Sequence, residues 1–139
     1  MTEQELIKQA FQAREFSYAP YSGFRVGAAL ETSDGVVYEG CNIENAGYSP
    51  TNCAERTAFF KAVSEGCHNF HKIAIVGGKE KGDVVADYAA PCGVCRQVMM
   101  EFCNTKDFQI IVAKSIEDYQ VFTLEELLPM GFGPDNLKM

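Results

Sequence analysis

Three cysteines in two short stretches could hold a metal ion. Cys53 lies in the stretch 51–58, and Cys92 and Cys95 form a Cys-x2-Cys pair in the stretch 90–97. Both stretches begin with residues that favour a helix start, and the partial positive charge of a helix N-terminus lowers the pKa of a cysteine. A structural zinc site is normally closed by four protein ligands, whereas a catalytic site leaves one position open for water. Three thiolates therefore indicate a catalytic zinc site.

Glu55 is the candidate proton carrier of this site. It follows Cys53 by two residues, and the first turn of a helix is tight enough to bring it near the open position of the metal. Zinc would supply hydroxide near neutral pH, and a neighbouring carboxylate can take the proton and pass it to a leaving group. The pattern predicts metal-assisted hydrolysis with Glu55 as the proton shuttle.

Arg56 and Arg96 each stand beside a ligand stretch. Three thiolates on a divalent zinc leave a net charge of about −1, which discourages a bound water from ionising. An arginine that hydrogen-bonds a sulfur would withdraw some of that charge. The alternative for both residues is a solvated helix face or an ordinary salt bridge.

Two interpretations of the cysteines involve no catalysis. The three thiols could simply be core residues, since free cysteine behaves as a small hydrophobic side chain. They could also form a structural zinc site that Asp, His or a remaining cysteine closes as the fourth ligand. Cys41, Cys67 and Cys103 are expected to be ordinary buried or half-buried thiols.

Length and charge restrict the class of protein. The 139 residues, 47% of them hydrophobic, are enough for one domain over 1–139 with its own core. A net charge of −7 argues against nucleic acid or an anionic membrane as partner, and a neutral small molecule has no such requirement. No basic-flanked apolar segment opens the chain, and no run approaches the ~18 apolar residues of a membrane span. Six cysteines, interpreted as metal ligands and buried thiols, favour the cytoplasm.

Hydrophobic periodicity predicts alternating helices and strands that would position these residues. The expected helices cover about 3–17, 51–65, 91–103 and 122–128. The expected strands cover 24–31, 36–41, 72–78 and 108–113. Asp34-Gly35 predicts a hairpin between the first two strands, and the candidate N-caps are Thr51 or Asn52 and, later, Thr123. The alternation predicts an α/β sandwich with a mixed sheet.

The two cysteine stretches resemble those of the zinc nucleoside deaminases. Cys53-Ala54-Glu55 and Pro91-Cys92-Gly93-Val94-Cys95 match the three-cysteine form of that signature. The stretches 21–29 and 42–48 precede them in the order found in the small cytidine deaminases, so the resemblance covers about Tyr18 to Phe132. Ala90 stands where many members have a serine, and the connection 79–89 is a few residues longer than usual.

The resemblance implies a three-layer α-β-α sandwich with a mixed five-stranded sheet and one zinc ion per subunit. It implies hydrolysis of cytidine, and also of deoxycytidine, to the uridine product and ammonia in pyrimidine salvage. It further implies a homotetramer whose active sites are shared between subunits. Two rival functions stay open: a deaminase of a nucleotide or a related aminonucleoside, and a non-catalytic zinc scaffold.

A nucleoside site is also implied by the resemblance. Asn42 and Glu44 would hydrogen-bond ribose hydroxyls, and Phe24 would lie against the nucleoside. The other residues implied at the substrate are Asn45, Ala46, Tyr48, the backbone near Ala54 and Cys92, and Phe132 from a neighbouring subunit. The alternatives are a plain polar loop over 42–48 and ordinary packing for the two phenylalanines.

Overall fold

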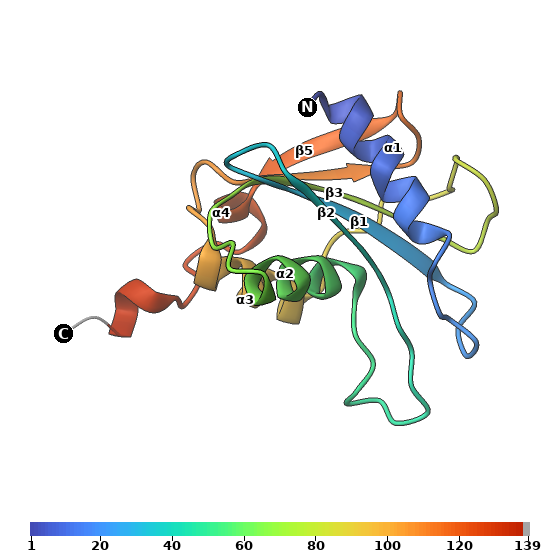
Figure 1. Ribbon diagram of the computed structural model, residues 1–139, viewed down its shortest axis with the longest axis horizontal. Helices are drawn as coiled ribbons and strands as arrows, with labels where there is room; N and C mark the ends of the chain where they lie inside the picture. Colours follow the sequence, from blue (N-terminus) through green and yellow to red (C-terminus); the bar gives the residue numbers. More distant parts are fainter. Residues whose placement is uncertain (138–139) are drawn as a thin grey trace.

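The computed structural model describes residues 1–137 and arranges them around a mixed sheet of five strands (Figure 1). The strands are β1 (Arg25–Thr32), β2 (Val37–Cys41), β3 (Phe70–Gly78), β4 (Gln109–Ala113) and β5 (Tyr119–Thr123). Their order is β2-β1-β3-β4-β5, with only β3 and β4 parallel among neighbours. The helices are α1 (Glu3–Arg14), α2 (Ala54–Ser64), α3 (Gly93–Phe102), α4 (Leu124–Leu127) and a 3-10 turn, η1 (Pro134–Leu137).

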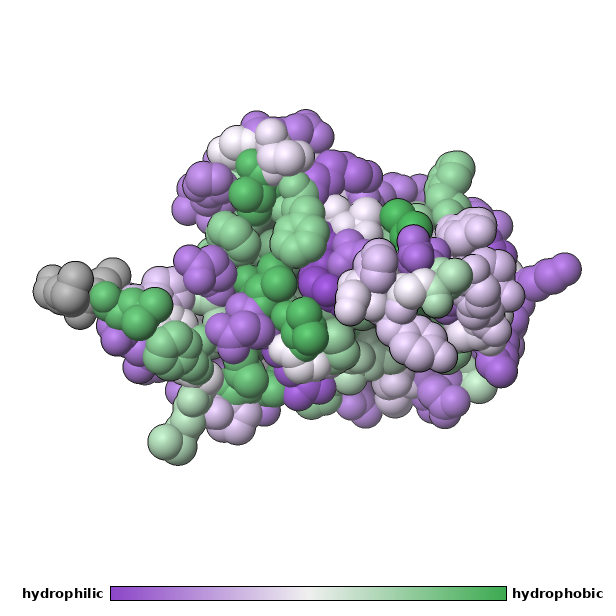
Figure 2. Space-filling view, turned by 90° about the horizontal axis from the view of Figure 1, so that it is seen from below, coloured by the Kyte–Doolittle hydropathy of each residue, from purple (hydrophilic) through white to green (hydrophobic). Residues whose placement is uncertain are grey.

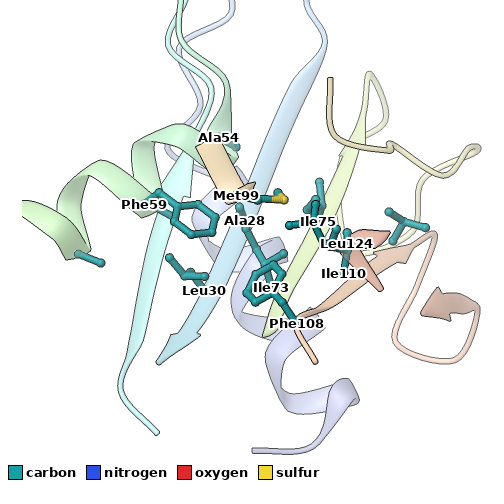
Figure 3. Packing of buried hydrophobic residues seen from close by; sticks show 13 residues of the cluster. Ala28, Leu30, Ala54, Phe59, Ile73, Ile75, Met99, Phe108, Ile110 and Leu124 are labelled. Atoms are coloured by element: carbon teal, nitrogen blue, oxygen red, sulfur yellow. The ribbon is translucent and has the colours of Figure 1, made fainter. Parts of the chain in front are cut away.

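Helices cover both faces of the sheet, as the three-layer prediction requires (Figure 1). Alternation along β1 sends Ala28 and Leu30 to the face of α2 and α3, and Ala29 to the face of α1. Phe59 of α2 and Met99 of α3 are fully buried on the first face (Figure 3). The two helices that carry the cysteines are therefore fixed by the same core.

Two glycines let the helices approach the sheet closely. A Cβ atom at Gly27 of β1 would collide with the backbone of α1 at Ala10 and Arg14. A Cβ atom at Gly40 of β2 would collide with the backbone of α2 at Ala54 and Ala58. The first turn of α2 therefore rests directly on a strand.

The structure corrects the expected cap of α2. Its N-cap is Cys53, with an extended backbone, and neither Thr51 nor Asn52 takes that role. The Thr51 hydroxyl instead accepts a hydrogen bond from the Asn45 backbone N–H at 3.0 Å, and the backbone of Asn52 pairs with that of Ile43. Both candidate caps are thus used to close the loop that precedes the helix.

Other boundaries differ by a few residues or match. The first helix ends at Arg14 instead of residue 17, whereas the β1–β2 hairpin and the Thr123 cap are confirmed. Periodicity did not predict β5, because its half-exposed residues do not alternate clearly and end in the cap of α4.

Candidate active site

Cysteines occupy the starts of both helices on one face of the sheet. Cys53 is the N-cap of α2, and its side chain makes no capping hydrogen bond. Cys92 is the N-cap of α3, and its Sγ accepts from the backbone N–H of Cys95 at 3.5 Å. The partial positive charges of two helix ends therefore act on the same small group of sulfurs.

The three sulfurs have the spacing of a metal site. All three Sγ atoms lie within 4.8 Å of one another. The Cys53–Cys92 distance is 3.8 Å and the Cys92–Cys95 distance is 3.6 Å. Tetrahedral zinc with bonds of about 2.3 Å separates its sulfur ligands by about 3.8 Å. The donor set and its spacing fit zinc with three thiolates, and Cys41, Cys67 and Cys103 lie outside this group.

Hydrogen bonding favours the thiolate form of Cys53. Hydrogen bonds from Cys95 and, more weakly, from Arg56 and Cys92 lower the pKa of Cys53 to about 5, against the effect of burial. Arg56 donates from Nη2 to the Cys53 sulfur at 3.3 Å. The Nε atom of Arg56 is buried and has no hydrogen-bond partner among the described residues. Arg56 therefore has the contact that a charge-withdrawing role requires.

Arg96 does not take the expected position against a sulfur. Its Nε donates to the carbonyl of Pro91 at 2.7 Å, and its Nη1 donates to the carbonyl of Leu127 at 2.6 Å. A residue one position after Cys95 points about 100° away from it around the helix, which explains the difference. Arg96 instead ties the turn before Cys92 to α4.

Glu55 lies in the first turn of α2 with only 4% of its surface exposed. Burial raises the pKa of Glu55 to about 7, and the nearby Cys53 thiolate acts in the same direction. A carboxyl group with this pKa can accept and donate a proton near neutral pH, which general acid–base catalysis requires.

A cavity of about 190 Å³ joins this group to a polar loop. Its wall contains the predicted residues Phe24, Asn42, Glu44, Cys53, Ala54, Glu55 and Cys92. The wall also contains residues that were not predicted from the sequence: Val26, Thr51, Asn52, Ile75, Ala89 and Ala90. Strand alternation could have indicated Val26 and Ile75, but nothing in the sequence marks the two alanines.

Glu44 and Asn42 are held in different ways at the far side of the cavity. Glu44 Oε1 accepts from the backbone N–H groups of Tyr21 at 2.9 Å and Ser22 at 3.1 Å. The amide of Asn42 accepts from the Val26 N–H and donates to the Phe24 carbonyl, each at 2.8 Å. Asn42 Oδ1 also accepts from the Ser17 hydroxyl. Asn42 therefore keeps one amide N–H donor for a ligand, whereas Glu44 keeps one acceptor site.

Four of the residues implied by the resemblance lie outside the cavity wall. Asn45, Ala46 and Tyr48 are on the exposed part of the loop, where the Tyr48 side chain is 93% exposed. Phe132 lies on another surface, and its carbonyl accepts from Gln97 at 2.7 Å. A single chain does not bring these residues to the substrate cavity.

The long connection 79–89, which supplies Ala89, is anchored at its start. The buried Arg14 donates to the carbonyls of Gly78 at 2.8 Å, of Gly82 at 3.2 Å, and of Glu80. Farther along, the Tyr88 hydroxyl donates to Asp118.

Within residues 1–137, no helix is long and apolar enough to cross a membrane.

Comparisons with known proteins agree with this geometry. Residues 1–112 match the family model of the cytidine and deoxycytidylate deaminase zinc-binding region. The chain is 48% identical over 137 residues to a cytidine deaminase of Sporosarcina psychrophila, covering 99% of this chain and 96% of that protein. Its fold matches the crystal structure of a cytidine deaminase from Burkholderia pseudomallei with a TM-score of 0.83. The two sequences are 46% identical, and the match covers 95% of this chain and 100% of that one. For the cytidine deaminase structure from Mycobacterium tuberculosis the identity is 34% and the TM-score 0.78, covering 96% and 98% of the two chains.

Proposed function

The chain belongs to the zinc-dependent cytidine and deoxycytidylate deaminase family, and on that basis we propose how its own residues carry out the reaction. It is an enzyme that hydrolyses cytidine to uridine and ammonia. Cys53, Cys92 and Cys95 are the proposed zinc ligands, and Glu55 is the proposed acid and base. When bound, zinc acts as a Lewis acid that lowers the pKa of water toward neutrality.

Glu55 moves each proton in the proposed sequence. Its carboxylate takes a proton from the attacking water and delivers it to the ring nitrogen beside the amino-bearing carbon. The carbon becomes tetrahedral, and Glu55 then carries the hydroxyl proton to the amino group. Ammonia leaves, and the carbonyl of uridine remains. The observation that carries this proposal is the buried Glu55, with a pKa of about 7, in one cavity with Cys53 and Cys92.

The cavity wall favours a neutral nucleoside as substrate. Its described lining includes the carboxylates of Glu44 and Glu55 and no lysine or arginine. A nucleotide phosphate would meet like charge there without a compensating cation. We propose that cytidine and deoxycytidine are substrates in pyrimidine salvage, with Glu44 as an acceptor of ribose hydroxyls, Asn42 beside it and Phe24 against the nucleoside.

Loss of the cytidine absorbance on mixing with purified enzyme tests the activity directly. The panel contains cytidine, deoxycytidine, cytidine monophosphate and free cytosine. Turnover of the two nucleosides but not of the other two is the expected result. Turnover of the monophosphate at the rate of cytidine would contradict the nucleoside assignment.

We also propose a homotetramer in which a neighbouring subunit completes each site. Hydrophobic residues gather over α2, α3 and the C-terminal segment (Figure 2). These parts of the chain contain the exposed side chains of Phe60, Val94, Met130, Phe132 and Leu137. Contiguous exposed apolar residues mark interaction surfaces. Phe132 would come from the neighbour, with Asn45, Ala46 and Tyr48 at the shared edge. Full activity of a monomer on dilution, with mass measured by light scattering, would contradict this assembly.

We propose the cytoplasm as location and residues 1–139 as a single domain. The six cysteines form no disulfide within residues 1–137, which is typical of proteins in a reducing compartment.

A further inference from the structure

Ser22 lies behind Glu44, at the turn that leads into β1. Both oxygens of the Glu44 carboxylate are held by this turn. Oε1 accepts from the backbone N–H groups of Tyr21 and Ser22, and Oε2 accepts from the Ser22 hydroxyl. Glu44 belongs to the connection between β2 and α2, so these bonds join two loops that are 22 positions apart in sequence.

The direction of the Ser22 hydroxyl proton follows from its two partners. Ser22 Oγ accepts from the backbone N–H of Phe24 at 2.9 Å. The hydroxyl has one proton, and an ionised carboxylate can only accept. The hydroxyl of Ser22 therefore donates its proton to Glu44 Oε2, and a lone pair on Ser22 Oγ accepts from the backbone N–H of Phe24. One hydroxyl thus links two residues that line the same cavity.

We propose that Ser22 is a positioning residue that determines how Glu44 recognises the ribose hydroxyls of the substrate. This inference rests on the proposed nucleoside function. With two acceptor sites on each oxygen, Oε1 is fully occupied by backbone donors. Oε2 keeps one acceptor site, and the Ser22 hydroxyl sets its direction. A substrate hydroxyl must therefore approach that one site as a donor.

Backbone donors and the hydroxyl have separable effects. In a Ser22→Ala variant the backbone N–H groups of residues 21 and 22 still hold Oε1, so Glu44 stays in place. Only Oε2 loses its fixed direction, and the Phe24 N–H loses its acceptor. A bound ribose covers this group and lowers the local dielectric, which makes a misdirected charged hydrogen bond more costly than in the free enzyme.

The experiment compares cytidine with 2′,3′-dideoxycytidine in the zinc-loaded enzyme. The quantity measured is the ratio of kcat/KM for the two substrates. We expect Ser22→Ala to lower this ratio about tenfold, the size of one hydrogen bond to a charged group, through cytidine alone. Ser22→Thr keeps the hydroxyl and should restore the ratio. Ser33→Ala, in the turn between β1 and β2, is the matched control and should leave the ratio unchanged.

A second measurement does not depend on turnover. The hydrogen bond from Ser22 is the largest cause that lowers the pKa of Glu44. The pKa of Glu44, followed by carbon NMR of the carboxyl group, should therefore rise in Ser22→Ala and not in Ser33→Ala. An unchanged pKa would overturn the inference, and so would a raised pKa with an unchanged substrate ratio.

Failure of the proposed function has a different signature. If wild-type enzyme consumes no cytidine, the nucleoside assignment falls whatever the pKa measurement gives, and the role of Ser22 in recognition falls with it. If wild-type enzyme consumes cytidine and Ser22→Ala slows both nucleosides equally, the function stands and Ser22 has only a structural role.

Discussion

α1, which covers one face of the sheet, begins differently from α2 and α3, the two helices on the other face that begin at cysteines. α1 begins with a capping box: Thr2 Oγ1 accepts from the Glu5 N–H at 3.1 Å, and Glu5 Oε1 accepts from the Thr2 N–H at 3.3 Å. α2 and α3 begin at Cys53 and Cys92, with no capping box. The face that α1 covers carries none of the proposed chemistry.

This difference shows what a helix start can be used for. In α1 the unpaired N–H groups of the first turn are satisfied by residues of the same helix, which contributes only to stability. In α2 and α3 the N-cap residue is a cysteine, so the partial positive charge of the helix end acts on a thiolate beside the substrate cavity. Five substitutions separate the two uses.

The largest effect should come from Glu55→Gln. This variant keeps the shape of the side chain but cannot carry a proton, so kcat should fall by about 10⁴-fold, near the upper limit for one acid–base group. Zinc content, measured by mass spectrometry, should remain one ion per subunit. Glu65→Gln, at the C-cap of the same helix, is the matched control and should keep full activity. Retained turnover in Glu55→Gln would remove this residue from the mechanism.

Gly40→Ala and Gly27→Ala compare the two faces directly. Each added methyl group meets the backbone of a helix, and overpacking of this kind costs about 1–3 kcal/mol. Only Gly40→Ala displaces the first turn of α2, so it should reduce zinc content and activity per folded molecule. Gly27→Ala should lower the unfolding temperature but leave zinc content unchanged. Equal zinc loss in both variants would mean that the metal site responds to stability alone.

Arg56→Ala should have a smaller effect at the metal site. It removes the donor to the Cys53 sulfur, and loss of such a partner typically costs about 10- to 100-fold in metal affinity or activity. Competition with a zinc chelator and steady-state kinetics provide the two measurements. The proposed charge withdrawal fails if turnover and zinc retention are both unchanged.

Thr2→Ala should have the smallest effect. It breaks the capping box of α1, which should lower the unfolding temperature by about 3–5 °C. Since α1 covers the other face of the sheet, kcat and zinc content should stay at wild-type values. A loss of zinc in this variant would show that the two faces are coupled.

The cysteine group could be predicted because its residue types carry their chemistry in the sequence. Cys53 with Glu55, and the Cys-x2-Cys pair, have spacings that few other structures would require. Arg96 was placed wrongly because neighbouring sequence does not say which side of a helix a long side chain takes. Its partners, Pro91 and Leu127, lie 5 and 31 positions away.

The wall of the cavity was only partly predictable for the same reason. Ala89 and Ala90 belong to it because a buried arginine in α1 anchors the preceding segment from 64 to 68 positions away. A small apolar residue in a loop has no pattern of its own. Strand β5 was not predicted because it lies at the edge of the sheet and is only partly buried, so its hydrophobic and polar residues do not alternate regularly.

The spacing of the thiols along the chain has a consequence for unfolding. Cys53 and Cys92 are 39 positions apart, and the central strand β3 runs between them. A zinc ion bound by both cysteines cross-links the ends of this segment. Such a cross-link lowers the conformational entropy of the unfolded chain more than that of the folded one. Removal of the metal by a chelator would therefore abolish turnover and, because the cross-link is lost, would also lower the unfolding temperature.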